Sequence, residues 1–430
     1  MTYHDGWTIK DMKTVTYYPK LEDVKQAANR LRDVACLTPL ELNTLYSEKY
    51  QSSIYFKRED LQPVRSYKIR GAYNKISTLS KEDLSNGIVC ASAGNHAQGV
   101  AMSCKLLNIH GTIYMPTPTP VQKIQQVKMF GGRYVTIVMH GDTYDDSYYA
   151  AMEENKKLGK TFIHPFDDEK VIEGQATVGL EIMEQSKVPI DYVIMPVGGG
   201  GLSAGVSSVL KYLSPHTKII GVEPKGATSM ATSIFNRENT TLDKIDSFVD
   251  GAAVKRVGER NFEICQQNLT ETINVSEGAI CQTILDLYNS QAIVVEPAGA
   301  MSITALESIR EKIKGKNVVC VVSGSNNDIT RTAEIKERAL LESQLKHYFI
   351  VRFPQRAGAL KEFVEKVIGP NDDITHFEYT KKTNRINGSA VVGIELKNTS
   401  DFDSLVQRMK SLNFYGDYIN NNPTLFEFLV

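Results

Sequence analysis

Short apolar runs alternate with amphipathic stretches along the first three quarters of the chain. The runs are SIYFK (53–57), GIVCAS (87–92), GTIYMP (111–116), RYVTIVM (133–139), DYVIMPV (191–197), KIIGVEP (218–224), SQAIVVEP (290–297) and NVVCVVSG (317–324). Such runs, rich in β-branched residues, are typical of strands in a parallel sheet that helices cover on both faces. Helical patterns lie at 21–35, 96–107 and 204–213. The alternation predicts an α/β fold with right-handed crossovers.

The pattern changes near residue 335. A charged helical stretch, EIKERALLESQ (334–344), is suited to a linker, and smaller elements follow it. The predicted elements are a strand at 347–353, a helix at 359–368, strands at 374–381 and 389–396 around an Asn387-Gly388 turn, a helix at 402–412 and a strand at 424–430. A β-α-β-β-α-β order is the ferredoxin-like arrangement of an α+β domain. We therefore expect two domains, 1–335 and 345–430.

Composition narrows the class of protein. A chain of 430 residues exceeds the size of a single core, and a net charge of −1 gives no sign of a nucleic-acid or membrane partner. We find no pattern of a signal peptide or of a transmembrane helix. The six cysteines form no C-x-x-C pair and several lie in apolar runs, which favours reduced thiols in a cytoplasmic protein. The eight histidines show no metal-ligand spacing, so no metal site is expected.

Four consecutive glycines, Gly198, Gly199, Gly200 and Gly201, separate an apolar run from a helical pattern. Backbone N–H groups in such a loop can turn toward an anion, and the start of a helix adds its positive dipole end. The segment therefore predicts a phosphate site. The spacing Gly199-x-Gly201-x-x-Ala204, followed by Glu223, also fits a relaxed dinucleotide fingerprint. The Walker A pattern does not fit, because no Gly-Lys follows the glycines.

Two further runs end in polar turns. Ser92-Ala93-Gly94-Asn95-His96 opens a helix where backbone N–H groups are free, which suits a carboxylate; a plain N-cap is the alternative. Ser323 follows a buried run, where open α/β sheets bind ligands, and Glu296 repeats that layout. Together these segments predict one crevice above a sheet edge.

Lys68 stands between an aromatic and an apolar residue in RSYKIRGA (65–72). Most lysines in such a place are surface residues whose stems pack while the ammonium reaches water. A lysine held in apolar surroundings has a lowered pKa and can act as a nucleophile or a base.

Read in order, these motifs resemble those of the fold-type II pyridoxal-phosphate enzymes, the tryptophan synthase β-subunit group, and within it the biosynthetic threonine dehydratases. The matching residues are Arg58-Glu59-Asp60, Ser66-Tyr67-Lys68-x-Arg70-Gly71-Ala72, Ser92 to Gly99, Gly198 to Leu202, Glu296 to Gly299 and Ser323-Gly324. The likeness covers about residues 20–330, and the C-terminal part resembles the single ACT-like domain of the short forms. Tyr67 stands where the group usually has Phe, and Ser325 stands where a glycine is more usual.

The resemblance implies a role for each motif. Lys68 would form the Schiff base with pyridoxal 5'-phosphate and act as the base at Cα. Gly198, Gly199, Gly200, Gly201 and Leu202 would hold the cofactor phosphate, Asn95 its ring hydroxyl and Ser323 its pyridine nitrogen. Ser92, Ala93, Gly94, Asn95 and His96 would bind the substrate carboxylate. A hydroxyl at Ser323 leaves the ring nitrogen largely neutral, which favours elimination over transamination.

The resemblance also implies a reaction and its control. L-threonine would be deaminated by β-elimination to 2-oxobutanoate and ammonia, the first step of isoleucine biosynthesis, and L-serine would give pyruvate. Isoleucine would inhibit through the ACT-like domain of a homotetramer. Three alternatives stay open: a dinucleotide-dependent oxidoreductase, another enzyme of the same cofactor group such as a serine racemase, catabolic dehydratase or β-replacement enzyme, and a non-enzymatic amino-acid sensor.

Overall fold

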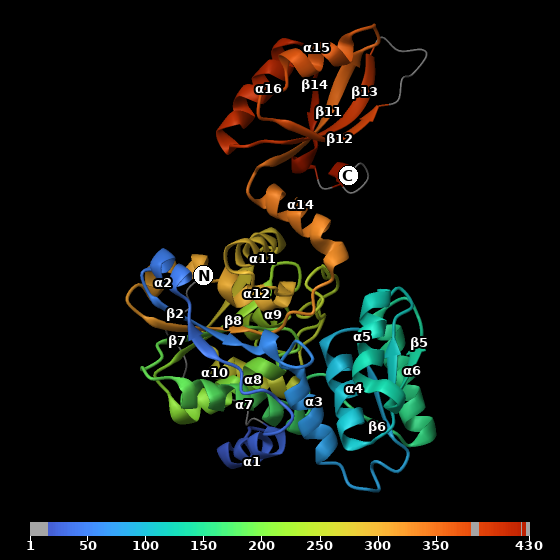
Figure 1. Ribbon diagram of the computed structural model, residues 1–430, viewed down its shortest axis with the longest axis vertical. Coiled ribbons are helices and arrows are strands. Elements are labelled where there is room, and N and C mark those ends of the chain that lie inside the picture. The colour runs from blue at the N-terminus through green and yellow to red at the C-terminus, as the bar shows by residue number, and fades with distance from the viewer. Residues whose placement is uncertain (1–15, 380–386, 423, 427–430) are drawn as a thin grey trace. The chain divides into compact units, whose positions relative to one another are not determined.

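The computed structural model describes residues 16–379, 387–422 and 424–426 of the chain (Figure 1). The chain divides into two compact units, Met1–Ile329 and Thr330–Val430. The boundary falls shortly before the charged stretch 334–344 that the sequence suggested as a linker. The assignment of domains to 1–335 and 345–430 stays a prediction.

The first unit contains a six-stranded sheet with the order β1-β2-β10-β7-β8-β9. Its strands are β1 (Leu40–Leu42), β2 (Ser53–Arg58), β7 (Tyr192–Pro196), β8 (Lys218–Pro224), β9 (Glu271–Val275) and β10 (Asn317–Val322). Only the short edge strand β1 is antiparallel to its neighbour, and every other pairing is parallel. The central strands β7 and β10 are mostly apolar and buried because helices cover both faces of the sheet.

Helices lie on both sides of this large sheet (Figure 1). One side carries α1 (Leu21–Leu31), α7 (Glu169–Gln185), α8 (Gly201–Leu213) and α10 (Glu259–Asn268). The other side carries α2 (Thr44–Tyr50), α11 (Glu277–Gln291) and α12 (Pro297–Thr304). The unit also contains α9 (Ser229–Asn236) and α13 (Arg310–Ile313).

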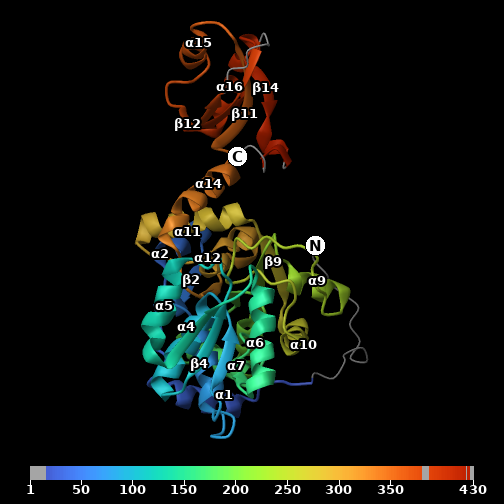
Figure 2. The same ribbon diagram turned by 90° about the vertical axis from the view of Figure 1, so that its right-hand side faces the viewer.

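A second, four-stranded parallel sheet belongs to the same unit, with the order β5-β4-β3-β6. Its strands are β3 (Ile88–Ala91), β4 (Gly111–Met115), β5 (Val135–Met139) and β6 (Thr161–Phe162). Helices α4 (Asn95–Leu107) and α5 (Val121–Gly131) cover one face, and α6 (Tyr144–Leu158) covers the other (Figure 2). The two sheets therefore define two lobes, which we call the large lobe and the small lobe.

Helix α3 (Lys68–Ser77) lies between the lobes and packs tightly on α7. A Cβ added at Gly174 of α7 would lie 2.5 Å from the carbonyl oxygen of Arg70 and 2.7 Å from Cα of Gly71. Arg70 itself is buried and donates to Glu59 through Nε (2.8 Å) and to Glu181 through Nη1 (2.6 Å). Paired charges are the form in which a buried arginine is tolerated, so this network fixes the start of α3.

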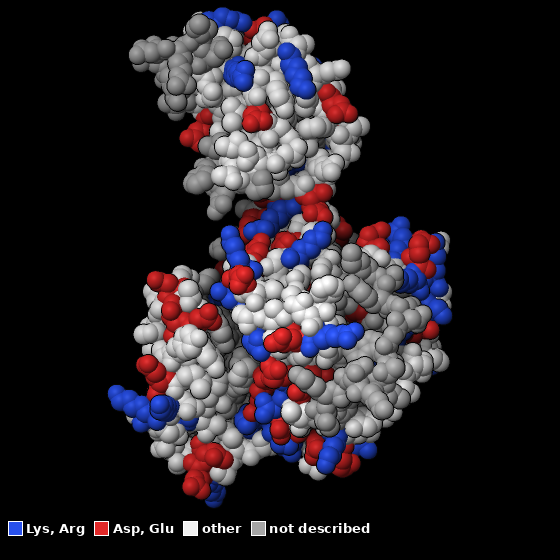
Figure 3. Space-filling view, turned by 180° about the vertical axis from the view of Figure 1, so that it is seen from behind, with Lys and Arg blue, Asp and Glu red and all other residues white. Residues whose placement is uncertain are grey.

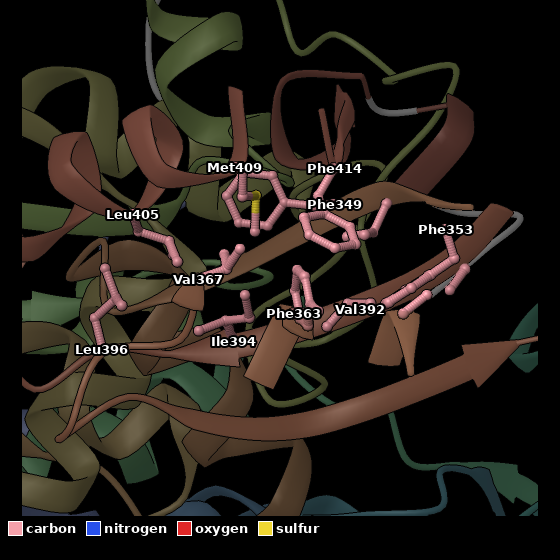
Figure 4. Close-up of a cluster of buried hydrophobic side chains, with 13 residues drawn as sticks. Phe349, Phe353, Phe363, Val367, Val392, Ile394, Leu396, Leu405, Met409 and Phe414 are labelled. Atoms are coloured by element: carbon pink, nitrogen blue, oxygen red, sulfur yellow. The ribbon is translucent and has the colours of Figure 1, made fainter. Parts of the chain in front are cut away.

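The second unit has the order β11 (Lys346–Pro354), α15 (Ala359–Lys366), β12 (Asp373–Tyr379), β13 (Asn387–Glu395), α16 (Phe402–Ser411) and β14 (Tyr415–Tyr418), preceded by α14 (Thr332–Glu342). All its strand pairings are antiparallel, with the order β12-β13-β11-β14. This is the ferredoxin-like arrangement, as predicted. Its core is rich in aromatic rings, with Phe349, Phe353, Phe363 and Phe414 packed together (Figure 4).

Three predicted elements are wrong. Residues 290–297 form no strand: α11 runs to Gln291 and α12 begins at Pro297. Asn387 and Gly388 form no turn, because both lie in β13 and pair with Pro354 and Phe353 of β11. The last strand of the second unit is β14 rather than 424–430; residues 424–426 are helical, and 427–430 lie outside the described residues.

The surface carries charges of both signs, and basic and acidic side chains are interspersed over the face shown in Figure 3. Among the cysteines Cys36 is exposed and the other five are buried. Within the described residues, no helix is both long enough and apolar enough to cross a membrane.

Candidate active site

Lys68 is the first residue of α3 and is partly buried. Its Nζ donates a hydrogen bond to the carbonyl oxygen of Pro165 (2.9 Å), in the segment that leads from β6 to α7. The amine also lies 5.4 Å from the ring centroid of Tyr67. Lys68 is therefore held inside the unit by a neutral oxygen and an aromatic face, and no ion pair is found for its ammonium among the described residues.

The surroundings of Lys68 favour its neutral form. Burial lowers the pKa of this lysine to about 8, and the nearby carboxyl of Glu296 opposes the shift. Burial raises the pKa of Glu296 to about 7, helped by the charge of Asp250. Lys68 and Glu296 thus both titrate near neutral pH, which is unusual for either residue type and typical of functional sites.

The four glycines lie at the turn from β7 to the start of α8, and we call them the phosphate loop (Gly198–Gly201) after their predicted role. Gly200 has φ +90°, a conformation that side chains rarely adopt. The ring of Phe166 lies directly against Gly199, where an added Cβ would overlap it. Only glycine therefore fits at these two positions, and the loop ends at the N-terminus of a buried helix that extends to Leu213.

The segment Ser92–His96 joins β3 to the N-terminus of α4. The hydroxyl of Ser92 accepts a hydrogen bond from the backbone of Gly94 (3.2 Å). An added Cβ at Gly94 would meet nothing within 4 Å, so this residue borders open space. The first turn of α4 presents the backbone N–H groups that a helix start leaves unpaired, which suits an anion. Residues 92–95 are all partly buried.

The side chain of Asn95 does not cap α4. Its Nδ2 donates to Oε1 of Glu296 (2.7 Å), so it joins the small lobe to the residue before α12 of the large lobe. A second link between the lobes is the ion pair of Lys123 in α5 with Asp250. The predicted site residues therefore come from two sheets, and the expectation of a site above the edge of one sheet is wrong.

Ser323 is buried beyond the end of β10. Its carbonyl oxygen accepts a hydrogen bond from the backbone of Tyr67 (3.2 Å), the residue before Lys68. Gly324 follows it, and Glu296 lies so close that an added Cβ there would overlap its carboxyl. Lys68, Ser323, Glu296 and Asn95 thus come together although they are far apart in the sequence.

Polar atoms of the site are left without partners in a way that fits pyridoxal phosphate. Asn95 Oδ1 and Ser66 Oγ are buried and have no hydrogen-bond partner in the described structure. Buried polar atoms are normally paired, so two unpaired atoms beside Lys68 and Glu296 fit a site that binds a polar molecule. A lowered-pKa amine, a glycine loop at a helix start and a buried hydroxyl at Ser323 match the aldehyde, phosphate and ring nitrogen of that cofactor.

Two of the predicted site residues, His96 and Leu202, have side chains that point away from the predicted binding groups. The imidazole of His96 is turned into the small lobe, where its Nε2 lies 2.9 Å from the carbonyl oxygen of Ile163, and burial lowers its pKa to about 3. The side chain of Leu202 is buried in the core beneath α8. Only their N–H groups can serve an anion, so the assigned roles of both residues stay predictions.

The structure does not favour the dinucleotide-binding alternative, because Glu223, the acidic residue of that fingerprint, has other partners. Both carboxyl oxygens of Glu223 accept hydrogen bonds at the start of α9, from the backbone N–H groups of Met230 and Ala231 (both 2.7 Å). Because this carboxyl is buried and already accepts two hydrogen bonds, it is not available to bind a ribose.

Among the described residues, no group of three or more His, Cys, Asp or Glu side chains could hold a metal ion.

Three contributors to the site are hard to predict from the amino-acid pattern. Glu296 was visible as a polar residue after an apolar run, but the site needs its contact with Asn95, which joins residues 201 positions apart. The carbonyl of Pro165 and the ring of Phe166 lie in a loop whose residue types carry no signal. Contacts of this kind depend on the tertiary fold alone.

Comparison with known proteins agrees with this geometry. Residues 32–324 match the family model described as pyridoxal-phosphate-dependent enzyme, and residues 337–429 match the C-terminal regulatory domain of threonine dehydratase. The chain is therefore a member of the pyridoxal-phosphate-dependent enzymes of fold type II. Individual related proteins show which branch of this family the chain belongs to.

The chain is 55% identical to the biosynthetic L-threonine dehydratase IlvA of Halalkalibacterium halodurans over 411 residues, 96% of this chain and 99% of that protein. It is 52% identical to the enzyme of the same name from Bacillus subtilis, over 96% and 97% of the two chains. The structure of threonine deaminase isoform 2 from Solanum lycopersicum superposes with a TM-score of 0.70 at 42% identity, covering 75% of this chain and 90% of that one. The chain belongs to the biosynthetic threonine dehydratase family.

Proposed function

We propose that the chain deaminates L-threonine to 2-oxobutanoate and ammonia by β-elimination, the first step of isoleucine biosynthesis. The observation that carries the proposal is the buried amine of Lys68, with a pKa of about 8, between a phosphate loop and a second helix start. An amine of this kind is partly neutral at cellular pH and can both attack a carbonyl and accept a proton.

The cofactor would be held by residues of both lobes. The backbone of Gly198–Leu202 would bind its phosphate, Asn95 Oδ1 its ring hydroxyl and the hydroxyl of Ser323 its ring nitrogen. When bound, pyridoxal phosphate supplies the electron sink that stabilises negative charge at the substrate Cα. Because serine carries no charge, Ser323 would leave the ring nitrogen neutral, which favours rapid loss of the β-hydroxyl.

The chain's own groups would then orient the substrate and move its proton. The helix start at Ser92–His96 would bind the substrate carboxylate through backbone N–H groups. Lys68 would take the proton from Cα, the β-hydroxyl would leave with a proton as water, and Lys68 would release its proton before the next turnover. The Pro165 carbonyl, which accepts from Nζ, would hold the amine on the side of the crevice where this proton leaves. L-serine differs from L-threonine by one methyl group, so the same residues would convert it to pyruvate.

The second unit would supply control. Its strand β11 ends at Pro354 and α15 begins at Ala359, so the turn between them has the strand-to-helix form that ACT-like domains use for small amino acids. We infer that isoleucine lowers activity through this domain in a cytoplasmic homotetramer, as the family resemblance implies.

An absorbance spectrum followed by product detection tests the proposal. Purified protein should carry a visible band that is absent from Lys68→Ala, and addition of L-threonine should release 2-oxobutanoate. Isoleucine should then reduce the rate in the same assay. A protein that takes up the cofactor but releases no 2-oxo acid from L-threonine or L-serine would contradict the proposed reaction and favour a racemase or β-replacement activity.

A further inference from the structure

Asn261 in α10 is fully buried and contacts two parts of the site at once. Its Nδ2 donates to the carbonyl oxygen of Gly199 in the phosphate loop (2.8 Å) and to the carbonyl oxygen of Phe166 (3.0 Å). Nothing in its sequence surroundings marks this asparagine, and its side chain is not exposed to solvent. Its contacts are with the main chain of two loops that come from different parts of the sequence.

The contact with Gly199 fixes the orientation of a peptide group. The same carbonyl also accepts from the backbone N–H of Gly258 (3.1 Å), so it is held by two donors. In a trans peptide the carbonyl and the next N–H point in opposite directions, so the N–H of Gly200 points away from α10. The carbonyl of Gly200 accepts from Ala204 (2.8 Å), which leaves the N–H of Gly201 pointing out of the start of α8.

The hydrogen bond to Phe166 connects Asn261 with the segment that contacts Lys68. Phe166 follows Pro165, whose carbonyl oxygen accepts from Lys68. The same segment is tied to α10 a second time, because Asp167 accepts from the backbone of Glu259 (3.0 Å) and of Arg260 (3.1 Å). Asn261 therefore forms hydrogen bonds both to the phosphate loop and to the segment that holds the amine of Lys68.

The packing leaves this side chain no freedom. A Cβ at Gly200 would lie 2.8 Å from Cβ of Asn261, and a Cβ at Gly258 would lie 2.6 Å from its Nδ2. Its Oδ1 is buried without a hydrogen-bond partner in the described structure. An unpaired buried oxygen destabilises the fold, so the value of this amide lies in the two hydrogen bonds that its nitrogen donates.

We propose that Asn261 is a positioning residue that turns the N–H groups of the phosphate loop toward the cofactor phosphate and sets the spacing between that loop and Lys68. The proposal rests on pyridoxal phosphate being the cofactor. It assigns Asn261 no contact with substrate, cofactor or reacting atoms.

Binding of pyridoxal phosphate and of pyridoxal, which lacks the phosphate, to the full-length cofactor-free chain tests this role. The variant is Asn261→Ala, and the matched control is Asn239→Ala. Asn239 is also buried, its Nδ2 donates to Val257 (3.1 Å) and Glu259 (2.8 Å), and its Oδ1 is also unpaired, but it does not contact the phosphate loop. Loss of stability should therefore be similar in both variants.

We expect Asn261→Ala to weaken binding of pyridoxal phosphate by about tenfold or more, the size of an effect from lost hydrogen bonds that orient charge-binding groups. Binding of pyridoxal should change much less, and the ratio of the two affinities should be unchanged in Asn239→Ala. If Asn261→Ala does not fold, Asn261→Ser, which keeps one donor, should show a smaller fall in the same ratio.

Equal weakening of both ligands, or an unchanged ratio in the folded variant, would overturn the proposed role. A parallel thermal unfolding measurement separates this result from a general loss of stability. Failure of the unaltered chain to bind pyridoxal phosphate at all is a different outcome, because it would contradict the cofactor rather than the role of Asn261.

Discussion

The amine of Lys68 and the carboxyl of Glu296 share one buried environment, so a change at one should move the pKa of the other. The negative charge of Glu296 raises the pKa of Lys68, which burial alone would lower below about 8. Glu296→Gln should therefore lower the pKa of Lys68 further. The measurement is the rate at which pyridoxal phosphate reacts with the cofactor-free chain as a function of pH, because only the neutral amine attacks.

The midpoint of that profile should move to lower pH in Glu296→Gln. Glu223→Gln is the control, because Glu223 is also a buried carboxyl with a pKa raised to about 7, but no contact or charge effect links it to Lys68. A midpoint that moves equally in both variants, or to higher pH in Glu296→Gln, would contradict the link.

Replacement of Lys68 itself should remove both functions of its amine. Lys68→Ala should lower the deamination rate by about a thousandfold or more, since proton transfer by a positioned side chain contributes on that order. Lys75→Ala, on the same helix and in an ion pair with Asp168 (2.7 Å), should retain most of the activity. A Lys68 variant with normal turnover would show that another group acts as the base.

At the scale of residues, the sequence can predict a role where a motif requires a residue type. Gly198–Gly201 and Lys68 could be singled out in this way, and their roles stay predictions. Glu296, Asn261 and the Pro165 carbonyl act through contacts between distant segments. Hydrophobic periodicity contains no information about such partners, so they could not be assigned a role in advance.

At the scale of elements, the contact of α3 with α7 decides where Lys68 stands. Gly174→Ala would place a Cβ 2.5 Å from the Arg70 carbonyl and push α3 away from α7. Because the clash is with the backbone of α3 rather than with a flexible side chain, a small local shift cannot relieve it. We therefore expect the free energy of unfolding to fall by about 1–3 kcal/mol. Urea denaturation monitored by circular dichroism measures this, and an unchanged midpoint would contradict the tight packing described here.

Long apolar runs predicted most strands of the first unit, but the same signal failed at 290–297. Val294 and Val295 lie in an extended connection between two helices, and Val295 is buried there without a strand partner. An apolar run indicates that a segment is buried, but it does not distinguish a strand from a buried connection. Strands β6 and β9 lacked such a run, since β6 has two residues and β9 is partly exposed, so the sequence did not reveal them.

At the scale of the molecule, every residue assigned to the site lies in the first unit. A chain ending at Ile329 should therefore still release 2-oxobutanoate from L-threonine, while the response to isoleucine should disappear. Rates with and without isoleucine, for the full chain and the shortened one, measure this directly. Inhibition that persists in the shortened chain would place the effector site in the catalytic unit.

The α/β class and the ferredoxin-like order of the second unit followed from the sequence, but the division of the first unit into two sheets did not. Buried strands of parallel sheets have similar compositions, so the sequence does not indicate which strands pair with each other. The predicted residues come from both sheets because the strands that precede them pair into two separate sheets.

The phosphate loop has a consequence for how this protein tolerates mutation. Recognition by main-chain N–H groups depends on shape rather than on side-chain identity, and every residue brings the same main chain. At Gly199 and Gly200 the smallest possible addition, one methyl group, already meets Phe166 or Asn261. In a library of all single substitutions these two positions should accept no replacement at all, whereas Gly94, which faces open space, should accept small ones.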